Sequence, residues 1–389
     1  MRFFALLFLS LPLWAKVVVP DGSVLPYQME GEVKIFRLIA EPVIREFAPG
    51  MVAHCWGYNG QVPGPVIEAI EGDRVRIYVT NKLPESTTVH WHGIILPNGM
   101  DGVNGLTQPS ILPGETFVYE FTLIQNGTFM YHPHADETVQ IGMGLVGMFV
   151  IHPKEELHPI DRDFCLMTQE WNVPVGAKGV NPFTGEFNYF TLNGKVFPGT
   201  SPLVAKMGDK IRIRCGNLSM NDHPIHLHGY EFTVTRSGGA RIPDSAQYTT
   251  VTLDLPTGFA KEIEFVANNP GDWALHCHKA HHVMNGMNHD IPNLMNAMPT
   301  QETIDKIRKY LPDYKPLGVH GMGMMYTGKP LPDSPPNFLP YGSPGPYGVI
   351  DIGGMFTVFK VRERLENYND PGWYDAPKGT VAHKVEYRG

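Results

Sequence analysis

The chain contains two copies of one segment, and this repeat limits the possible folds more than any other feature of the sequence. The first copy contains EGDRVRIYVTNKL followed by VHWHG, and the second contains MGDKIRIRCGNL followed by PIHLHG. Further along, the first copy reads PGETFVYEFTLIQNGTFMYHPH, which corresponds to PTGFAKEIEFVANNPGDWALHCH in the second. The repeat predicts two domains of one fold, covering about residues 28–153 and 160–300.

Short strands are expected in both copies. Segments such as DRVRIYV and KIRIRC alternate polar and apolar residues between Gly, Pro, Asn or Asp, and the chain holds 41 Gly and 35 Pro. This pattern predicts an all-β protein made of two antiparallel β-sandwiches. Only residues 301–311 carry a helical pattern. The C-terminal extension, residues 301–389, is rich in Met, Pro and Gly and is expected to be mostly irregular, with GGMFTVFKVRE as one further strand.

The N-terminal segment predicts where the protein is located, and the net charge limits which partners it can bind. Residues 1–15 combine Arg2, an apolar run too short to span a bilayer, and Ala15 as a cleavage position. We read them as a signal peptide, and therefore expect an exported protein, periplasmic or secreted, without a membrane span. The formal charge of −8 and the absence of a basic patch argue against a nucleic-acid partner.

The four cysteines form neither a zinc pattern nor a dense disulfide framework. Cys277 stands among histidines, whereas Cys55, Cys165 and Cys215 lie in apolar, strand-like runs. Small buried side chains are expected at those three positions, although two of them could form a disulfide in an oxidising compartment.

Ten of the 17 histidines lie in four clusters at matching places in the two copies. Such recurrence is improbable for unrelated surface or core histidines. One cluster lies in HCHKAHHVMNGM, where a strand over residues 274–278 would direct His276 and His278 to one face and Cys277 to the other. One Cys, two flanking His and a Met favour a mononuclear copper site for electron transfer.

The motifs HWHG, HPIHLHG and H-C-H-x3-H-x4-M resemble the copper-binding motifs of multicopper oxidases, and YHPH occupies the place of their remaining H-x-H motif. The resemblance covers both repeats and implies cupredoxin-like Greek-key sandwiches that hold four coppers per chain: one type 1, one type 2 and a type 3 pair. The implied type 1 ligands are His223, Cys277, His282 and Met287. The implied ligands of the other three coppers are His90 and His226 for type 2, and His92, His132, His134, His228, His276 and His278 for type 3.

The first copy lacks the type 1 ligands, because the positions of Cys277 and His282 are occupied there by Pro133 and Thr138. Each copy nevertheless keeps two H-x-H pairs, so the three-copper cluster should lie between domains. With no middle domain, the chain resembles two-domain laccases whose type 1 copper is in the second domain only and which assemble as trimers. We therefore expect a homotrimer.

The resemblance implies that a reducing substrate gives single electrons to the type 1 copper and that O2 is reduced to water at the cluster. Asp101 matches the acid that the family keeps near the type 2 copper and is expected to donate protons. Where the family frequently has a second carboxylate, this chain has His281. Either His281 relays protons itself, or Asp136, Glu137 or Asp222 takes that role.

The reducing substrate is either a phenol or aromatic amine, as for laccases, or Cu(I). Thioethers suit Cu(I), although methionines also fill irregular gaps in cores. A non-enzymatic copper-binding protein and a copper nitrite reductase remain as alternatives; the latter carries its type 1 cysteine in the first domain and lacks paired type 3 histidines. The methionines near the type 1 motif are Met284, Met295, Met298, Met322, Met324 and Met325.

Overall fold

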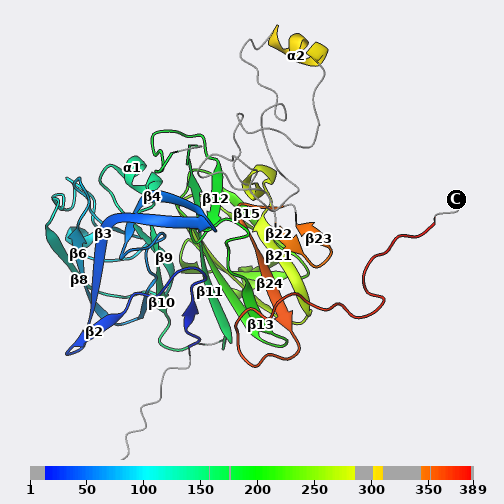
Figure 1. The fold of residues 1–389 in the computed structure, drawn as a ribbon. Coiled ribbons are helices and arrows are strands. Elements are labelled where there is room, and N and C mark those ends of the chain that lie inside the picture. The colour runs from blue at the N-terminus through cyan, green and yellow to red at the C-terminus, as the bar shows by residue number, and fades with distance from the viewer. Residues whose placement is uncertain are drawn as a thin grey trace, which may run out of the picture.

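Where polar and apolar residues alternate in the sequence, exposed and buried side chains alternate along the strands. In β6 (Arg74–Asn81) the residues Val75, Ile77 and Val79 are fully buried while the polar residues between them are not. The structure, a computed structural model, describes residues 14–156, 158–174, 177–284, 301–309, 343–350 and 352–386. These residues form two β-sandwiches that lie side by side (Figure 1).

The first sandwich has an outer sheet in the order β2-β3-β6-β8, with β4 on β3, and an inner sheet in the order β5-β10-β9-β7. The outer strands are β2 (Tyr27–Glu30), β3 (Val33–Ala48), β4 (Met51–Tyr58), β6 and β8 (Thr116–Thr122). The inner strands are β5 (Ile67–Ile70), β7 (His90–His92), β9 (Gly127–His132) and β10 (Gly147–His152).

The second sandwich has an inner sheet in the order β1-β11-β14-β20-β16-β17 and an outer sheet in the order β13-β24-β21-β15-β19. The inner strands are β1 (Val17–Val18), β11 (Arg162–Trp171), β12 (Tyr189–Leu192), β14 (Lys210–Asn217), β16 (Phe232–Ser237), β17 (Ala240–Arg241), β18 (Tyr248–Thr250) and β20 (Phe259–Val266). The outer strands are β13 (Leu203–Lys206), β15 (His223–Leu227), β19 (Thr252–Leu255), β21 (Gly271–Cys277) and β24 (Phe356–Arg362).

The predicted all-β, cupredoxin-like fold is confirmed. Both sandwiches also contain parallel neighbours, such as β3 with β6 and β11 with β14, because the chain crosses to the other sheet and returns in the same direction. Helices are short: η1 (Asn98–Met100), α1 (Glu137–Gly142), η2 (Asp244–Ala246), η3 (Ala280–Val283) and α2 (Gln301–Arg308). The predicted helix corresponds to α2. The expectation of a single helix was wrong, because α1 is too short to show helical periodicity.

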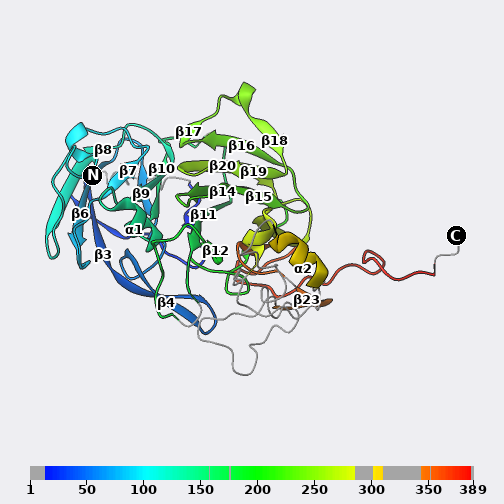
Figure 2. The ribbon, with the colours of Figure 1, turned by 90° about the horizontal axis from the view of Figure 1, so that it is seen from above.

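The two inner sheets pack against each other, so the molecule has four sheet layers (Figure 2). Met130 and Met148 from the first sandwich share one apolar cluster with Cys165 and Met167 from the second. Gly216 of β14 leaves room for this contact, since a Cβ there would lie 2.3 Å from the sulfur of Met148.

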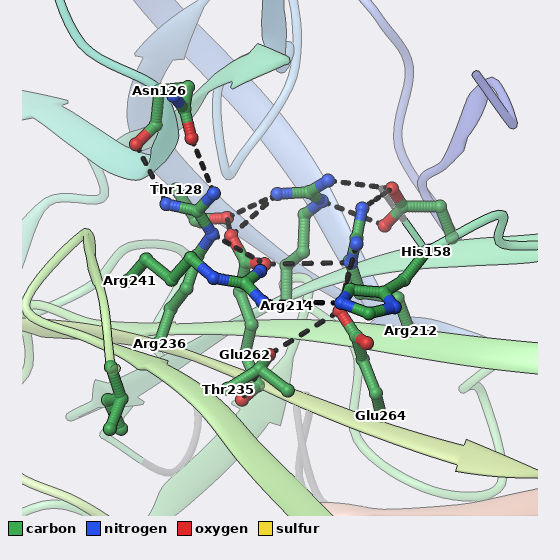
Figure 3. Close-up of polar contacts among 12 residues, drawn as sticks. Asn126, Thr128, His158, Arg212, Arg214, Thr235, Arg236, Arg241, Glu262 and Glu264 are labelled. Carbon is green, nitrogen blue, oxygen red and sulfur yellow. Dashed lines mark hydrogen bonds and ion pairs between the residues drawn. The ribbon is translucent and has the colours of Figure 1, made fainter. Parts of the chain in front are cut away.

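Hydrogen bonds of Thr128 also join the first sandwich to a buried group of ion pairs in the second (Figure 3). Arg214 donates to Asp163 and, through Nη1, to both Glu262 Oε1 at 2.7 Å and Thr128 Oγ1 at 2.8 Å. Thr128 belongs to the first sandwich, and its hydroxyl also donates to Glu262 Oε1 at 2.6 Å. Burial disfavours the carboxylate of Glu262, but three arginines outweigh burial and lower its pKa to about 2. We call Asp163, Arg214, Glu262 and Thr128 the interdomain clamp.

The predicted strand near the C-terminus is β24, and it lies inside the second sandwich, between β13 and β21. After β21 the chain forms η3, which ends at Val283, and the N–H of Gly353, shortly before β24, donates to the carbonyl of Val283 at 3.0 Å. Between these points the described residues include α2 and the hairpin of β22 (Ser343–Gly345) and β23 (Gly348–Ile350). No described helix is long and apolar enough to cross a membrane. The expected signal peptide lies almost entirely outside the described residues.

Candidate metal centre

Three donor atoms converge at one end of the second sandwich. His223 is the first residue of β15, Cys277 is the last of β21, and His282 lies in η3, which turns back over the strand ends. The Nδ1 atoms of the two histidines are 3.1 Å apart, and Cys277 Sγ lies 3.8 Å from Nδ1 of His223 and 3.5 Å from Nδ1 of His282. All three side chains are fully buried. These are three of the four predicted type 1 ligands; Met287 lies outside the described residues.

The electrostatics of this group fit a cation that takes soft and imidazole donors. Burial lowers the pKa of His223 to about 3 and that of His282 to about 2, so both imidazoles are neutral ligands at neutral pH. Burial raises the pKa of the Cys277 thiol to about 11. A thiolate is therefore stable here only beside a positive charge, as a bound copper would supply.

Four residues around the group were not predicted from the sequence. Ser219 Oγ lies 2.7 Å from His223 Nε2, and Phe190 stacks on the ring of His282 with centroids 4.1 Å apart. Glu170 Oε1 lies 3.9 Å from Nε2 of both histidines, and Asn221 donates to the same oxygen. Burial raises the pKa of Glu170. Glu170 is one of two carboxylates in the largely buried strand β11, the other being Asp163, and a charged residue in such a strand was the available signal.

The first sandwich gathers four of the predicted ligands at the ends of β7 and β9. His90 and His92 flank Trp91, whose side chain lies in the core, so both imidazoles face outward. His92 Nδ1 lies 3.3 Å from His132 Nε2, and the ring of His134 lies 5.7 Å from that of His90. Burial lowers the pKa of His132 to about 3. We call His90, His92, His132 and His134 the first histidine set.

The second sandwich gathers the matching four, and we call His226, His228, His276 and His278 the second histidine set. Nε2 of His228 and Nε2 of His276 are 3.2 Å apart, and the ring of His226 lies 5.6 Å from that of His278. The strand β21 ends at Cys277, so His278 lies just beyond it, yet its ring remains 5.6 Å from that of His276. The predicted division of faces is therefore observed, with Cys277 in the core and its neighbours outside.

Within one chain the two histidine sets are separate. The first lies on the inner sheet of the first sandwich, and the second lies on the outer sheet of the second, with the sheet of β11, β14 and β20 between them. Stacked sheets are about 10 Å apart, which places these two sheets about 20 Å apart. Among the described residues no ring contact joins the two sets.

The predicted acid Asp101 lies beside the first histidine set. Its carbonyl oxygen is 2.8 Å from His90 Nδ1, and its carboxylate is 3.4 Å from the same nitrogen. A proton on Nδ1 leaves Nε2 of His90 free for a metal. His281 instead lies at the surface beside the type 1 group, with its ring 4.2 Å from that of His282.

Of the three other acids considered from the sequence, Glu137 lies against the first histidine set, whereas Asp222 directly precedes the type 1 ligand His223. The carboxylate oxygens of Glu137 lie 3.6 Å from His132 Nδ1 and 4.0 Å from His134 Nε2. Asp222 accepts a hydrogen bond from the backbone of Thr257, and Asp136 precedes α1.

A cavity of about 640 Å³ lies between α1 and the type 1 group. Glu170 and Ser219 line it on the copper side, and Glu137 lines it on the side of the first histidine set. Phe183 and Met220 also line it, and both side chains are more than two-thirds exposed. The cavity thus reaches from solvent to the two residues nearest the Nε2 atoms of the type 1 histidines.

The remaining cysteines take no part in these sites. Cys55, Cys165 and Cys215 are buried free thiols, although a disulfide between two of them was considered possible. Burial raises the pKa of each thiol to about 12 or above, so all three are protonated and unreactive at neutral pH.

Two β-sandwiches with a buried His₂Cys group and outward-facing histidine pairs define a cupredoxin-like copper protein. Two family models, both described as multicopper oxidase, match residues 41–156 and 172–294. The chain therefore belongs to the multicopper oxidase family.

The similar proteins include several whose names refer to copper. Copper resistance protein A of Escherichia coli is 35% identical over 47% of this chain, and the chain spans only 31% of that protein. A copper-containing nitrite reductase of Neisseria meningitidis is 30% identical over 61% of this chain and 63% of its own length. The crystal structure of Blue Copper Oxidase from Nitrosomonas europaea has 27% identity and a TM-score of 0.62, covering 84% of this chain and 85% of that one.

Proposed function

We propose that the protein is an oxidase that accepts single electrons from a small reducing substrate beside His223, Cys277 and His282 and uses four of them to reduce O2 to water. The observation that carries this proposal is the position of Cys277 between His276 and His278. One peptide segment thereby joins a His₂Cys group to half of a histidine cluster.

Bound copper would supply one-electron redox chemistry at the His₂Cys group and multi-electron reduction of O2 at the histidine cluster. The chain supplies the connection between them. The carbonyl oxygen of Cys277 lies 2.8 Å from Nδ1 of His276, a distance that fits an N–H donated to that oxygen. This bond would leave Nε2 of His276 free and aimed beside Nε2 of His228, while the cysteine sulfur stays in the core.

Four coppers per chain require both histidine sets in one cluster. Because one sheet of the second sandwich separates them within the chain, the first set of one chain would meet the second set of its neighbour. Such head-to-tail contacts close a ring, and we propose a homotrimer with three clusters. The outward-facing imidazoles of both sets support this arrangement.

The proposed proton donor at the cluster is Asp101. Its carbonyl holds His90 in the tautomer that leaves Nε2 for a metal, and its carboxylate faces the same imidazole. Glu137 is the second proposed donor, because its two oxygens approach His132 and His134. The surface position of His281, beside the type 1 group, supports a role there instead of at the cluster.

The proposed substrate is a phenol or an aromatic amine that enters the cavity beside Glu170. The carboxylate of Glu170 accepts hydrogen bonds from O–H or N–H groups, and Phe183 offers an aromatic face at the mouth. Cu(I) is the second candidate, because the methionine-rich segment follows the type 1 ligand His282 in the sequence. In either case we propose that the protein is exported.

A nitrite reductase is the less favoured alternative, although relatives bearing that name are found. The first sandwich has Thr87, Pro133 and Thr138 at the places of the type 1 ligands, and Thr87 Oγ1 donates to Gln140 in the core. The first sandwich therefore offers no thiolate there, whereas both sandwiches present paired histidines.

Copper stoichiometry, the visible spectrum and O2 uptake together test the proposal. We expect four coppers per chain, an intense blue absorption band, and O2 consumption that a phenol or Cu(I) drives with a ratio of four electrons per O2. A blue protein that reduces nitrite but consumes no O2 would contradict it, as would one copper per chain.

The choice between substrates is tested by replacing Met322, Met324 and Met325 together with leucine. If Cu(I) is oxidised at a methionine site, turnover with Cu(I) falls while turnover with a phenol is retained. Equal losses with both substrates would exclude such a site.

A further inference from the structure

The residue directly before β24 is a methionine, Met355, and its backbone is bonded to the copper-site cysteine. The ladder between β21 and β24 pairs His276 with Phe356, and one step further along the same register Cys277 faces Met355. The ladder itself ends at His276 and Phe356, but the N–H of Cys277 donates to the carbonyl of Met355 at 3.0 Å, which keeps the two residues beside each other.

Residues that oppose each other in an antiparallel pair project to the same face of the sheet. Phe356 shares the outer face with His276, and their ring centroids are 6.1 Å apart. Met355 therefore shares the inner face with Cys277. Both side chains are fully buried and belong to one core cluster. Opposed Cβ atoms lie about 5 Å apart, a gap that an unbranched methionine side chain spans.

Met355 is also bonded to a second residue of the type 1 group. Its N–H donates to the carbonyl of His282 at 2.9 Å. A Cβ on the preceding Gly354 would lie 2.3 Å from that carbonyl, so the close approach requires glycine. The backbone of Met355 is thus fixed against both Cys277 and His282.

The return of the chain at Gly353 explains why residue spacing misses Met355. Because the N–H of Gly353 bonds to the carbonyl of Val283, Gly354 and Met355 meet η3 and Cys277 although they lie far from them in the sequence. The dipeptide Gly354-Met355 repeats Gly286-Met287 and is followed at once by the strand β24.

We propose that Met355, and not Met287, would provide the thioether ligand of the type 1 copper. The segment between Val283 and Gly353 is then an insertion within the set of copper ligands. This assignment rests on the proposed copper site at His223, Cys277 and His282.

The test compares leucine and glutamine replacements at Met355 with the same replacements at Met287, in the copper-loaded full-length protein. Leucine offers no donor and glutamine offers a harder oxygen donor, so a residue that touches the copper shifts its reduction potential upward with leucine and downward with glutamine. We expect opposite shifts for M355L and M355Q, each with altered visible and electron paramagnetic resonance spectra. M287L and M287Q should match the wild type.

Opposite shifts at Met287 with none at Met355 would overturn the assignment, as would equal shifts in one direction for both Met355 variants. A wild-type protein without a blue band would instead refute the underlying copper site. Should M355Q fail to fold, selenomethionine labelling decides the question. Copper scattering at the selenium absorption edge should disappear in M355L and persist in M287L; its persistence in M355L would overturn the assignment.

Discussion

Mixing two inactive variants tests whether the histidine cluster forms between chains. His134→Ala damages the first histidine set and His228→Ala damages the second, and both side chains are partly or fully exposed, so both variants should fold. Each variant alone should lose O2 consumption because every cluster contains one damaged half.

In mixed trimers some clusters combine the intact first set of the His228→Ala chain with the intact second set of the His134→Ala chain. In a head-to-tail ring of three that contains both variants, one of the three clusters combines two intact halves, so about a third of wild-type activity per chain should return in the mixed trimers. These clusters also keep their own His₂Cys group, because Cys277 and His276 belong to the same chain. Electron entry is therefore preserved.

The assay is O2 uptake with a phenol after co-expression of the two variants under different affinity tags and isolation of the doubly tagged species. A matched control pairs His134→Ala with His90→Ala, which damage the same set and should give no recovery. Mixed trimers that remain as inactive as the single variants would refute the interchain cluster. So would a fully active monomer.

Three further predictions follow from the residues around the sites. Replacing Glu262 of the interdomain clamp with Gln should cost on the order of 3 kcal/mol of stability, because a pKa lowered from about 4.5 to about 2 corresponds to that free energy. This contribution is present above about pH 4.5 and is lost as the pH falls toward 2, so acid unfolding monitored by circular dichroism should lose that pH dependence in the variant; an unchanged acid transition would contradict it. Asp101→Asn should lower O2 turnover by about 10²-fold at normal copper content, and unchanged turnover would refute its role as proton donor. Glu170→Gln should raise the reduction potential of the type 1 copper, by an amount on the order of 2 kcal/mol, since a buried negative charge favours the oxidised metal; redox titration of the blue band measures this, and an unchanged or lower potential would refute it.

The directions of the histidine side chains could be predicted from the sequence because they depend only on the local geometry of a strand. In HWH and HCH the alternation of a strand alone sends the outer residues to one face and the middle residue to the core, as seen for Cys277 and Trp91. The repeat then assigned each pair to a sandwich. The fold class followed from the same short-range alternation.

The residues that the sequence did not reveal are brought to the site by long-range pairing. Glu170 comes from β11, more than 100 residues before Cys277, and approaches the histidines only because β11 lies beside β14 in the inner sheet. Phe190 reaches His282 from β12 in the same way. Glu170 and Phe190 lie in other strands, at no fixed distance in sequence from the HCH motif. No local sequence pattern therefore identifies them as neighbours of the site.

The backbone contact between Gly353 and Val283 also affects how well the site tolerates changes in the length of the sequence between them. Loop-closure entropy grows only with the logarithm of length, so a loop of about 70 residues costs only about 2 kcal/mol more to close than one of about 5. The seven residues of β24, paired on both edges, offset that cost without any contribution from the metal. The position after Val283 should therefore tolerate inserted sequence. A segment exchanged there would leave the pairing of β24 with β21 intact, and with it the position of Cys277.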